Sequence, residues 1–184
     1  EFDPSACTWT VEASRGTVLL AGDSQSWAVA DGVITAAGEL GYDTTVAALN
    51  GCAFVSPDSD LPGDWAGCRE FRSDVVEFVA STKPVAVVVS NWSLGYVGNS
   101  PESRRRWTSG LVGLLDGFND VGVPVVVISS YPAGDADSMS RSLLIGPDDN
   151  RSADAVLRRE DRAWFFELET EAAAEYDEVF VLDP

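Results

Sequence analysis

A serine at the end of an apolar run is the first residue of this sequence that could do chemistry. Residues 17–21 (TVLLA) are mostly apolar, Gly22-Asp23-Ser24 follows them, and a helix-like pattern begins at once. Such a strand-to-helix turn exposes the serine hydroxyl and directs its backbone N–H outward at a helix N-terminus. A serine becomes a nucleophile for acyl transfer when a neighbouring base, usually an imidazole, accepts its proton. The chain contains no histidine, so it shows only the nucleophile half of an acyl-transfer site.

Two further apolar runs end in groups that could bind an oxyanion. Asn50-Gly51-Cys52 follows residues 44–49, and Asn91-Trp92 follows residues 85–90. A glycine N–H and an asparagine carboxamide both donate hydrogen bonds to the negative oxygen of a tetrahedral intermediate. Each group also has an ordinary interpretation, because Ser24 suits a helix N-cap, Gly51 a turn and Asn91 a loop cap. Their occurrence at three strand ends favours a site, since ligands bind at the carboxyl ends of parallel strands.

The elements that must position these groups alternate between strand and helix. We expect strands at 17–21, 44–49, 85–90, 123–129 and 178–182, and helices at 26–40, 64–82, 100–118 and 152–176. Residues 132–150 are rich in Gly, Pro, Asp and Ser and are predicted to form a loop. Because crossovers between parallel strands are right-handed, this order predicts an α/β fold, a three-layer α/β/α sandwich with a five-stranded, mostly parallel sheet. Residues 1–184 are predicted to form one domain.

Composition excludes several classes of partner. The 30 acidic and 12 basic residues give a net charge of −18, which repels DNA and anionic membrane surfaces, so no nucleic-acid partner is expected. No run of about 20 apolar residues is present to span a bilayer. The absence of histidine and of a Cys-x-x-Cys pair argues against zinc. We expect neither a metal nor a cofactor.

The three cysteines bear on the compartment. Cys52 and Cys68 bracket a loop with Pro and Gly turn residues, and we expect a disulfide between them, which would stabilise the fold by about 3 kcal/mol. A disulfide implies an extracytoplasmic location, whereas two buried thiols would suit a cytosolic protein. Cys7 then has no cysteine in the chain with which to pair, which hints at a partner outside the chain.

These motifs together resemble the SGNH (GDSL-like) hydrolase superfamily, in particular the extracytoplasmic domains fused to membrane acyltransferases of the acyltransferase-3 type. The residues that carry the resemblance are 19–24 (LLAGDS), 50–52 (NGC), 68–71 (CREF) and 87–92 (VVVSNW). The resemblance implies Ser24 as the nucleophile, with the Ser24 N–H, the Gly51 N–H and the Asn91 side chain as oxyanion donors.

The resemblance also implies substrates and a partner. The expected activity is that of an O-acetyltransferase or esterase, with an acyl donor and a cell-envelope glycan or glycolipid acceptor. A membrane acyltransferase domain in the same protein is the expected partner, and the outer face of the plasma membrane the expected location. Asp23, Gln25 and Trp92 lie beside the predicted site residues and are expected to contact the substrate.

The sequence departs from the family pattern at three places. Gln25 stands where a histidine often follows the serine, and residues 90–92 match the family's Gly-x-Asn-Asp block only at Asn91. The Asp-x-x-His motif, expected in a loop after the last strand, does not occur before the chain stops at Leu182-Asp183-Pro184. We therefore expect the domain to be truncated at its C-terminus, the catalytic His and Asp to follow Pro184, and the chain alone to be weakly active or inactive. Asp183 itself is expected to cap a strand end.

Two other functions stay open at this point. One is a non-catalytic relative that binds carbohydrate or lipid, or that assists a membrane acyltransferase. The other is a cytosolic flavodoxin-like binding domain with an incidental Gly-Asp-Ser, against which a Cys52–Cys68 disulfide would count. The basic run Arg104-Arg105-Arg106 is expected to form a solvated helix face, and Trp107 to pack in the core.

Overall fold

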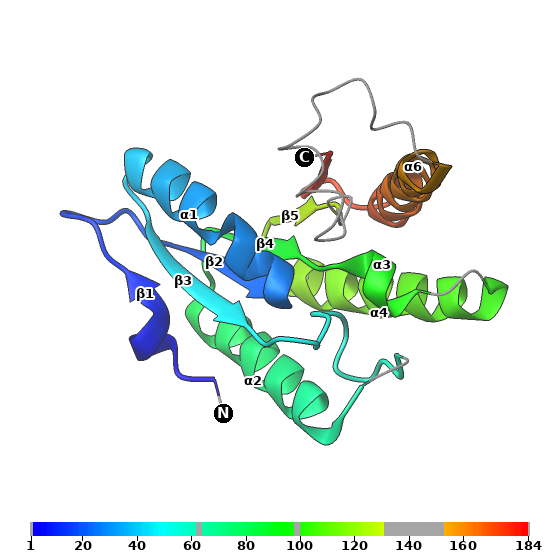
Figure 1. The fold of residues 1–184 in the computed structure, drawn as a ribbon. Coiled ribbons are helices and arrows are strands. Elements are labelled where there is room, and N and C mark those ends of the chain that lie inside the picture. The colour runs from blue at the N-terminus through cyan, green and yellow to red at the C-terminus, as the bar shows by residue number, and fades with distance from the viewer. Residues whose placement is uncertain (1, 62–63, 98–99, 131–152, 184) are drawn as a thin grey trace, which may run out of the picture.

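The computed structural model describes residues 2–61, 64–97, 100–130 and 153–183, with the backbone alone for Leu94 and for residues 153–162. The predicted loop at 132–150 lies outside these residues. The elements, in chain order, are a 3-10 helix Pro4–Cys7, β1 Thr8–Trp9, β2 Thr17–Gly22, α1 Ser24–Glu39, β3 Asp43–Ala48, α2 Ala66–Thr82, β4 Ala86–Ser90, α3 Ser93–Tyr96, α4 Pro101–Asp120, β5 Val125–Ile128, α6 Ala153–Ala173 and β6 Val179–Leu182 (Figure 1).

One sheet organises these elements. Its strand order is β1-β3-β2-β4-β5-β6, and every neighbouring pair is parallel except β1 with β3. The predicted α/β class and the five predicted strands are confirmed, and the sheet gains a sixth strand at its edge. Sequence periodicity missed β1 because it has two residues, Thr8 and Trp9, which pair with Thr45 and Thr44.

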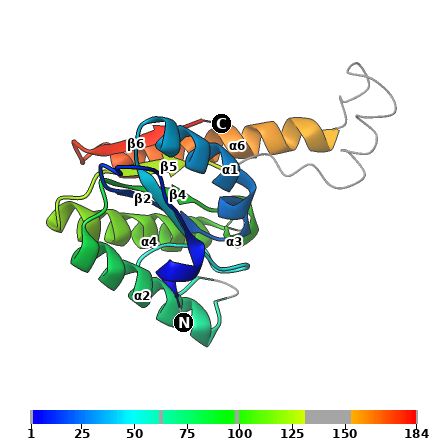
Figure 2. The same ribbon diagram turned by 90° about the vertical axis from the view of Figure 1, so that its left-hand side faces the viewer.

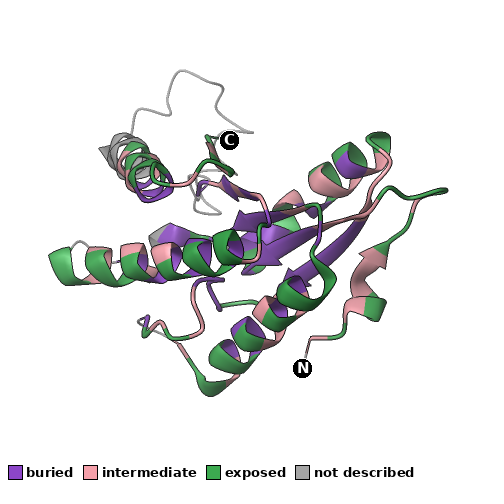
Figure 3. Cartoon of the chain, turned by 180° about the vertical axis from the view of Figure 1, so that it is seen from behind, coloured by how far each residue is buried: buried purple, intermediate pink, exposed green. Residues whose placement is uncertain are grey.

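Helices cover both faces of the sheet, as the three-layer prediction requires. In the side view α1 lies on one face and α2 and α4 on the other (Figure 2). The unalternating β-branched strands suit a sheet that is buried on two sides. Leu20, Val46 and Val88 pack under α1, whereas Leu19, Val87 and Val89 belong to the core shared with α2 and α4. The central strands β2, β3 and β4 are accordingly largely buried (Figure 3).

A third apolar cluster lies beyond the carboxyl ends of the strands. Residues of the loop after β3 pack there against α3, α4 and α6, and the cluster consists of Ala53, Val55, Leu61, Val97, Trp107 and Phe165. Trp107 is buried to 1% exposure, which confirms its predicted place in the core. This cluster fixes the loops around the candidate site, including the short helix α3 that periodicity could not reveal.

The passage from β2 into α1 requires a glycine. A Cβ atom at Gly22 would collide with the backbone carbonyl of Ser90 and with the Ser26 hydroxyl. The Ser90 carbonyl cannot move away easily, because it ends the neighbouring strand β4 and accepts a 2.8 Å hydrogen bond from Ser26 Oγ. Glycine at position 22 therefore lets α1 begin in contact with β4.

Gly22→Ala is expected to destabilise the protein by roughly 1–3 kcal/mol, because the added methyl overpacks a backbone contact. Gly32→Ala is the matched control, since Gly32 lies in α1 and its added Cβ would contact nothing within 4 Å. The control is expected to gain up to about 1 kcal/mol of helix stability. Thermal and urea unfolding measure both variants. Equal stability of the Gly22 variant and the wild type would contradict the close approach.

Candidate active site

The sheet brings the three predicted strand ends together. β2 lies between β3 and β4, and Gly22 at its end is in register with Ala48 of β3 and Ser90 of β4. The Leu49 N–H also donates to the Gly22 carbonyl at 3.0 Å, which continues the pairing past the end of β3. Because all three strands are parallel, the segments that begin at Asp23, Leu49 and Asn91 leave the sheet at the same edge. The candidate residues thus share one edge.

Ser24 is exposed, whereas Asn91 is buried. Ser24 is the first residue of α1, directly after the central strand β2. Its hydroxyl makes no hydrogen bond within the described part of the chain. The N-cap function that could have explained Ser24 belongs to Asp23, whose side chain accepts from Gln25 N. The role of Ser24 as a nucleophile stays a prediction.

Asp23 holds the turn together. It is 1% exposed, its Oδ1 accepts from the Gln25 N–H at 2.8 Å, and its Oδ2 accepts from the Trp92 N–H at 2.9 Å. Burial raises the pKa of Tyr96, and so does the Asp23 carboxylate, to which the Tyr96 hydroxyl donates. The Asp23 carboxylate thus joins the start of α1 to the segment after β4. Substrate contact by Asp23 stays a prediction.

Gln25 also points inward. Its side chain is 7% exposed, and its Nε2 donates to Ser90 Oγ at 3.3 Å. Trp92, by contrast, is 43% exposed at the start of α3. Of the three predicted substrate contacts, Trp92 therefore has the most accessible side chain, and contact by Gln25 also stays a prediction.

Asn91 clamps the loop after β3. Its Oδ1 accepts from the Phe54 N–H at 2.7 Å, and its Nδ2 donates to the Phe54 carbonyl at 3.1 Å. A carboxamide has two N–H donors. The second Nδ2 donor of Asn91 has no partner among the described residues, and the residue is 5% exposed, so a role as oxyanion donor stays a prediction. Gly51 lies in the same loop, exposed and with a φ of +70°, in the left-handed region that glycine adopts without strain.

A buried arginine that sequence analysis missed also contacts the loop after β3. Arg72 of α2 is fully buried, donates from Nε to the Ala53 carbonyl at 2.7 Å, and binds Asp64 through two nitrogens at 2.7 Å each. The signal in the sequence was an arginine on the apolar face of the predicted helix, three residues before Val75 and seven before Val79. Arg72 stabilises the loop that carries Gly51 and Phe54.

The structure corrects the predicted disulfide. Cys52 and Cys68 are buried free thiols that interact with each other, and the Cys68 thiol donates weakly to the Gly51 carbonyl at 3.9 Å. Burial, and next the neighbouring Cys68, raise the pKa of Cys52. A thiol kept protonated is a poor nucleophile for disulfide formation. The loop is closed by packing and by Arg72, so the disulfide no longer supports an extracytoplasmic location.

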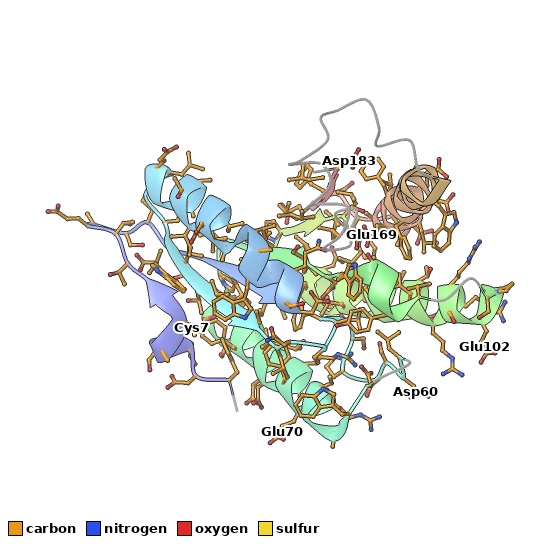
Figure 4. All side chains as sticks on the ribbon, in the orientation of Figure 1. Cys7, Asp60, Glu70, Glu102, Glu169 and Asp183 are labelled. Atoms are coloured by element: carbon orange, nitrogen blue, oxygen red, sulfur yellow. The ribbon has the colours of Figure 1, made fainter. Side chains whose placement is uncertain are left out.

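The remaining charged candidates have local roles. Arg106 forms exposed ion pairs with Glu102 and Asp60, which lie together at one end of the molecule (Figure 4), and Arg104 stacks over the Trp164 ring at 4.1 Å. Arg104 is half-buried, so only part of the basic run is a solvated face. Asp183 follows β6 (Figure 4). Among the described residues no group of three or more Cys, Asp or Glu side chains could hold a metal ion.

Comparison with known proteins decides the family. A family model described as an SGNH domain, fused to AT3 domains, matches residues 2–184. The chain belongs to this family. The resemblance seen in residues 19–24, 50–52, 68–71 and 87–92 is thereby confirmed. No curated protein sequence matches the chain.

Two solved structures share the fold of this SGNH domain. The first is the periplasmic domain of a lipopolysaccharide acetyltransferase from Salmonella ser. Paratyphi A, with a TM-score of 0.66, 9% identity, and coverage of 94% of this chain and 67% of that one. The second is a W190I mutant of Axe2, an acetyl-xylooligosaccharide esterase from Geobacillus Stearmophilus, with a TM-score of 0.53 and 14% identity. That match covers 92% of this chain and 76% of the esterase. Within the described residues of the SGNH domain, no helix is long and apolar enough to cross a membrane.

Proposed function

We propose that this SGNH domain transfers acyl groups and that Ser24 is its nucleophile. The observation that carries the proposal is an exposed serine at the end of the central strand, flanked by the segments that bear Gly51 and Asn91. The N–H groups of Ser24 and Gly51 and the uncommitted N–H of Asn91 would bind the oxyanion. Donors fixed in place before the reaction stabilise developing charge at no cost of reorganisation.

The proposed reaction has two steps. Ser24 Oγ attacks the carbonyl carbon of an acyl donor, a base takes the hydroxyl proton, and the bond from the acyl carbon to its leaving group breaks. A hydroxyl group of the acceptor, or water, then attacks the Ser24 ester and releases the serine. Membership in a family of domains fused to AT3 domains supports a membrane acyltransferase domain as the partner and an extracytoplasmic location.

The base is not evident within the 184 residues. The chain has no histidine, both Asp23 oxygens accept backbone hydrogen bonds, and Glu169 is buried. Neutral serine needs a base matched to the pH of the reaction. We propose that the imidazole, with its aspartate, comes from outside these residues, as the family's Asp-x-x-His motif implies. The alternative is a non-catalytic domain that binds carbohydrate or lipid; the missing histidine favours it.

Incubation with p-nitrophenyl acetate tests the role of Ser24. The 184-residue chain is expected to show at most slow turnover, and Ser24→Ala to change that rate little, because the base is missing. Added imidazole should then raise the yield of acetyl-Ser24, measured by peptide mass spectrometry against the Ser24→Ala chain as background. Fast hydrolysis that Ser24→Ala abolishes would reveal a base inside the chain. Failure of imidazole to acetylate Ser24 would favour the binding module.

Exposed tryptophans support a carbohydrate acceptor, either a glycan or a glycolipid. Trp27, Trp65 and Trp92 are 44%, 52% and 43% exposed, and they stand at the starts of the helices that follow β2, β3 and β4. Trp27 and Trp92 come shortly after the ends of β2 and β4, and Trp65 precedes α2, which follows β3 after a longer loop. Large aromatic faces left in water are unusual and form platforms for apolar ring surfaces, such as those of sugars. We refer to these three residues as the tryptophan rim.

Substitution of the tryptophan rim tests the acceptor class. Trp27→Ala, Trp65→Ala and Trp92→Ala are each expected to weaken binding of a neutral probe, xylotetraose, by roughly 2- to 10-fold, the range of one aromatic contact. Trp9→Ala is the control, because Trp9 is 42% exposed but pairs with Thr44 at the opposite end of β3. Saturation-transfer NMR measures binding. Equal losses in the control and the rim variants would contradict a role of the rim.

A further inference from the structure

A buried carboxyl group lies behind the candidate oxyanion site. Glu169 of α6 is 3% exposed and contacts the hydroxyl of Ser93 at the start of α3, and Ser93 in turn contacts Ser130 after β5; both serines are fully buried. Figure 4 places Glu169 on α6 beside α3. Periodicity on α6 contained the signal, since Glu169 lies on the same helix face as Phe165 and Ala172, which are buried.

Three short contacts link this carboxyl group to the Asn91 backbone. Glu169 Oε1 lies 3.2 Å from Ser93 Oγ, Ser93 Oγ lies 2.6 Å from Ser130 Oγ, and Ser130 Oγ lies 3.0 Å from the Asn91 carbonyl oxygen. The Ser93 N–H donates to Ser130 Oγ at 2.7 Å and so uses an acceptor position of that hydroxyl. The chain of contacts runs from α6 to the residue whose side chain is the proposed oxyanion donor.

The number of hydrogen bonds among these oxygen atoms depends on whether Glu169 carries a proton. Each of the three oxygen–oxygen contacts needs one proton to be a hydrogen bond. The Ser93 and Ser130 hydroxyls supply two protons, and an ionised carboxylate can only accept. When Glu169 carries a proton, it donates to Ser93, Ser93 donates to Ser130, and Ser130 donates to the Asn91 carbonyl. When Glu169 is ionised, the Ser93 hydroxyl turns to it, and one of the other two contacts loses its proton.

The surroundings of Glu169 favour its neutral form. Burial raises the pKa of Glu169 to about 7, and the hydroxyls of Ser129 and Ser93 lower it less. Glu169 Oε2 has no hydrogen-bond partner among the described residues. Three charged or titratable groups on the elements packed against α6 have other contacts: Arg104 stacks on Trp164, Asp116 accepts from the Tyr176 hydroxyl, and Tyr96 donates to Asp23. Asp183 follows β6, the strand that packs against α6.

We propose that Glu169 is a positioning residue of the oxyanion site, which in its protonated form fixes Asn91 through the Ser93 and Ser130 hydroxyls. The proposal rests on the proposed function in one respect, namely that Asn91 is an oxyanion donor. Asn91 is held on its other side by Phe54, and the Asp23 carboxylate holds the next N–H, that of Trp92. When Glu169 is ionised, the single Ser130 hydroxyl proton is shared between the contacts with Ser93 Oγ and with the Asn91 carbonyl, so the Ser130 contact with Asn91 is weakened. The Ser93 N–H, which donates to the Asn91 carbonyl at 2.9 Å, and the Phe54 and Asp23 contacts stay in place.

NMR of the isotopically labelled 184-residue chain between pH 5 and pH 9 tests the proposal. The Ser93 amide and the Asn91 carboxamide signals are expected to follow one titration with a midpoint near pH 7. Glu169→Gln, which keeps a neutral donor, should hold both signals near their low-pH positions at every pH. Glu167→Gln is the matched control, because Glu167 is exposed on the same helix, and it should leave the titration intact.

A second variant tests the contact of Ser130 with Asn91 separately from the contact of Glu169 with Ser93. Ser130→Ala removes the last hydroxyl, so the Ser93 amide should still titrate while the Asn91 carboxamide no longer does. Titration of Asn91 that persists in Glu169→Gln or in Ser130→Ala would overturn the proposal, as would signals in the wild type that do not change with pH. The experiment needs no turnover, and Ser24→Ala should give the wild-type titration. Its failure is therefore distinguishable from failure of Ser24 acylation.

Discussion

Arg72→Met is expected to lower the free energy of unfolding by about 3–5 kcal/mol, the usual cost of removing one partner of a buried ion pair. The substitution leaves the Asp64 carboxylate without its two 2.7 Å hydrogen bonds and the buried Ala53 carbonyl without its donor. Methionine fills much of the volume, so the loss measures missing polar contacts rather than a cavity. Urea unfolding followed by circular dichroism gives the free energy.

Two variants control this result. Arg69→Met makes the same change on the exposed side of α2 and is expected to alter stability by no more than about 0.5 kcal/mol. Arg72→Met combined with Asp64→Leu removes both charges and should recover part of the loss, because no unpaired charge is left. Similar losses of stability in the Arg72 and Arg69 variants would show that the contacts of Arg72 with Asp64 and Ala53 do not stabilise the fold.

Glu169→Gln is expected to remove a pH dependence of stability. The pKa of Glu169 is raised from 4.5 to about 7 by burial in the folded protein. Between those values the folded state binds more protons than the unfolded state, so stability falls as pH rises. The favourable contribution is fully present below about pH 4.5 and is lost as pH rises through 7. At 1.36 kcal/mol per pKa unit, ionising the buried group costs about 3 kcal/mol at pH 8.

The measurement is the free energy of unfolding at a series of pH values. Glu169→Gln should match the wild type near pH 4.5 and exceed its stability by up to about 3 kcal/mol at pH 8. Glu167→Gln should follow the wild-type curve, because its side chain is exposed. A wild-type curve parallel to that of Glu169→Gln would mean that Glu169 is ionised without cost in the folded state.

The layers of the fold could be predicted from the sequence because apolar runs and helical spacing are local signals. The runs 17–21 and 85–90 predicted β2 and β4 to within about one residue, and the alternation of elements predicted the parallel sheet. Strand β1 could not be predicted, because a two-residue strand has no period. The helix predicted from residue 26 begins at Ser24, since the Asp23 cap is a hydrogen-bond arrangement and not a pattern of hydrophobicity.

The candidate site was predictable only where it lies next to a strand end. Ser24, Gly51 and Asn91 each come within about three residues of a strand, so topology alone brings them together. Arg72 and Glu169 act across long sequence separations, on Ala53 and Ser93, and one sequence cannot reveal those pairings. The predicted disulfide was wrong for a related reason. Loop composition indicates that two cysteines can approach each other, but it does not show whether the sulfurs are bonded, and in the structure both are free thiols.

The residues Gly22, Asp23 and Ser24 have different roles. The glycine permits contact between α1 and β4, and the aspartate joins two neighbouring segments through backbone N–H groups. The serine is the residue of the three that we propose as the nucleophile. Gly22 and Asp23 therefore hold the fold together, and a related domain without catalytic activity would still need both residues.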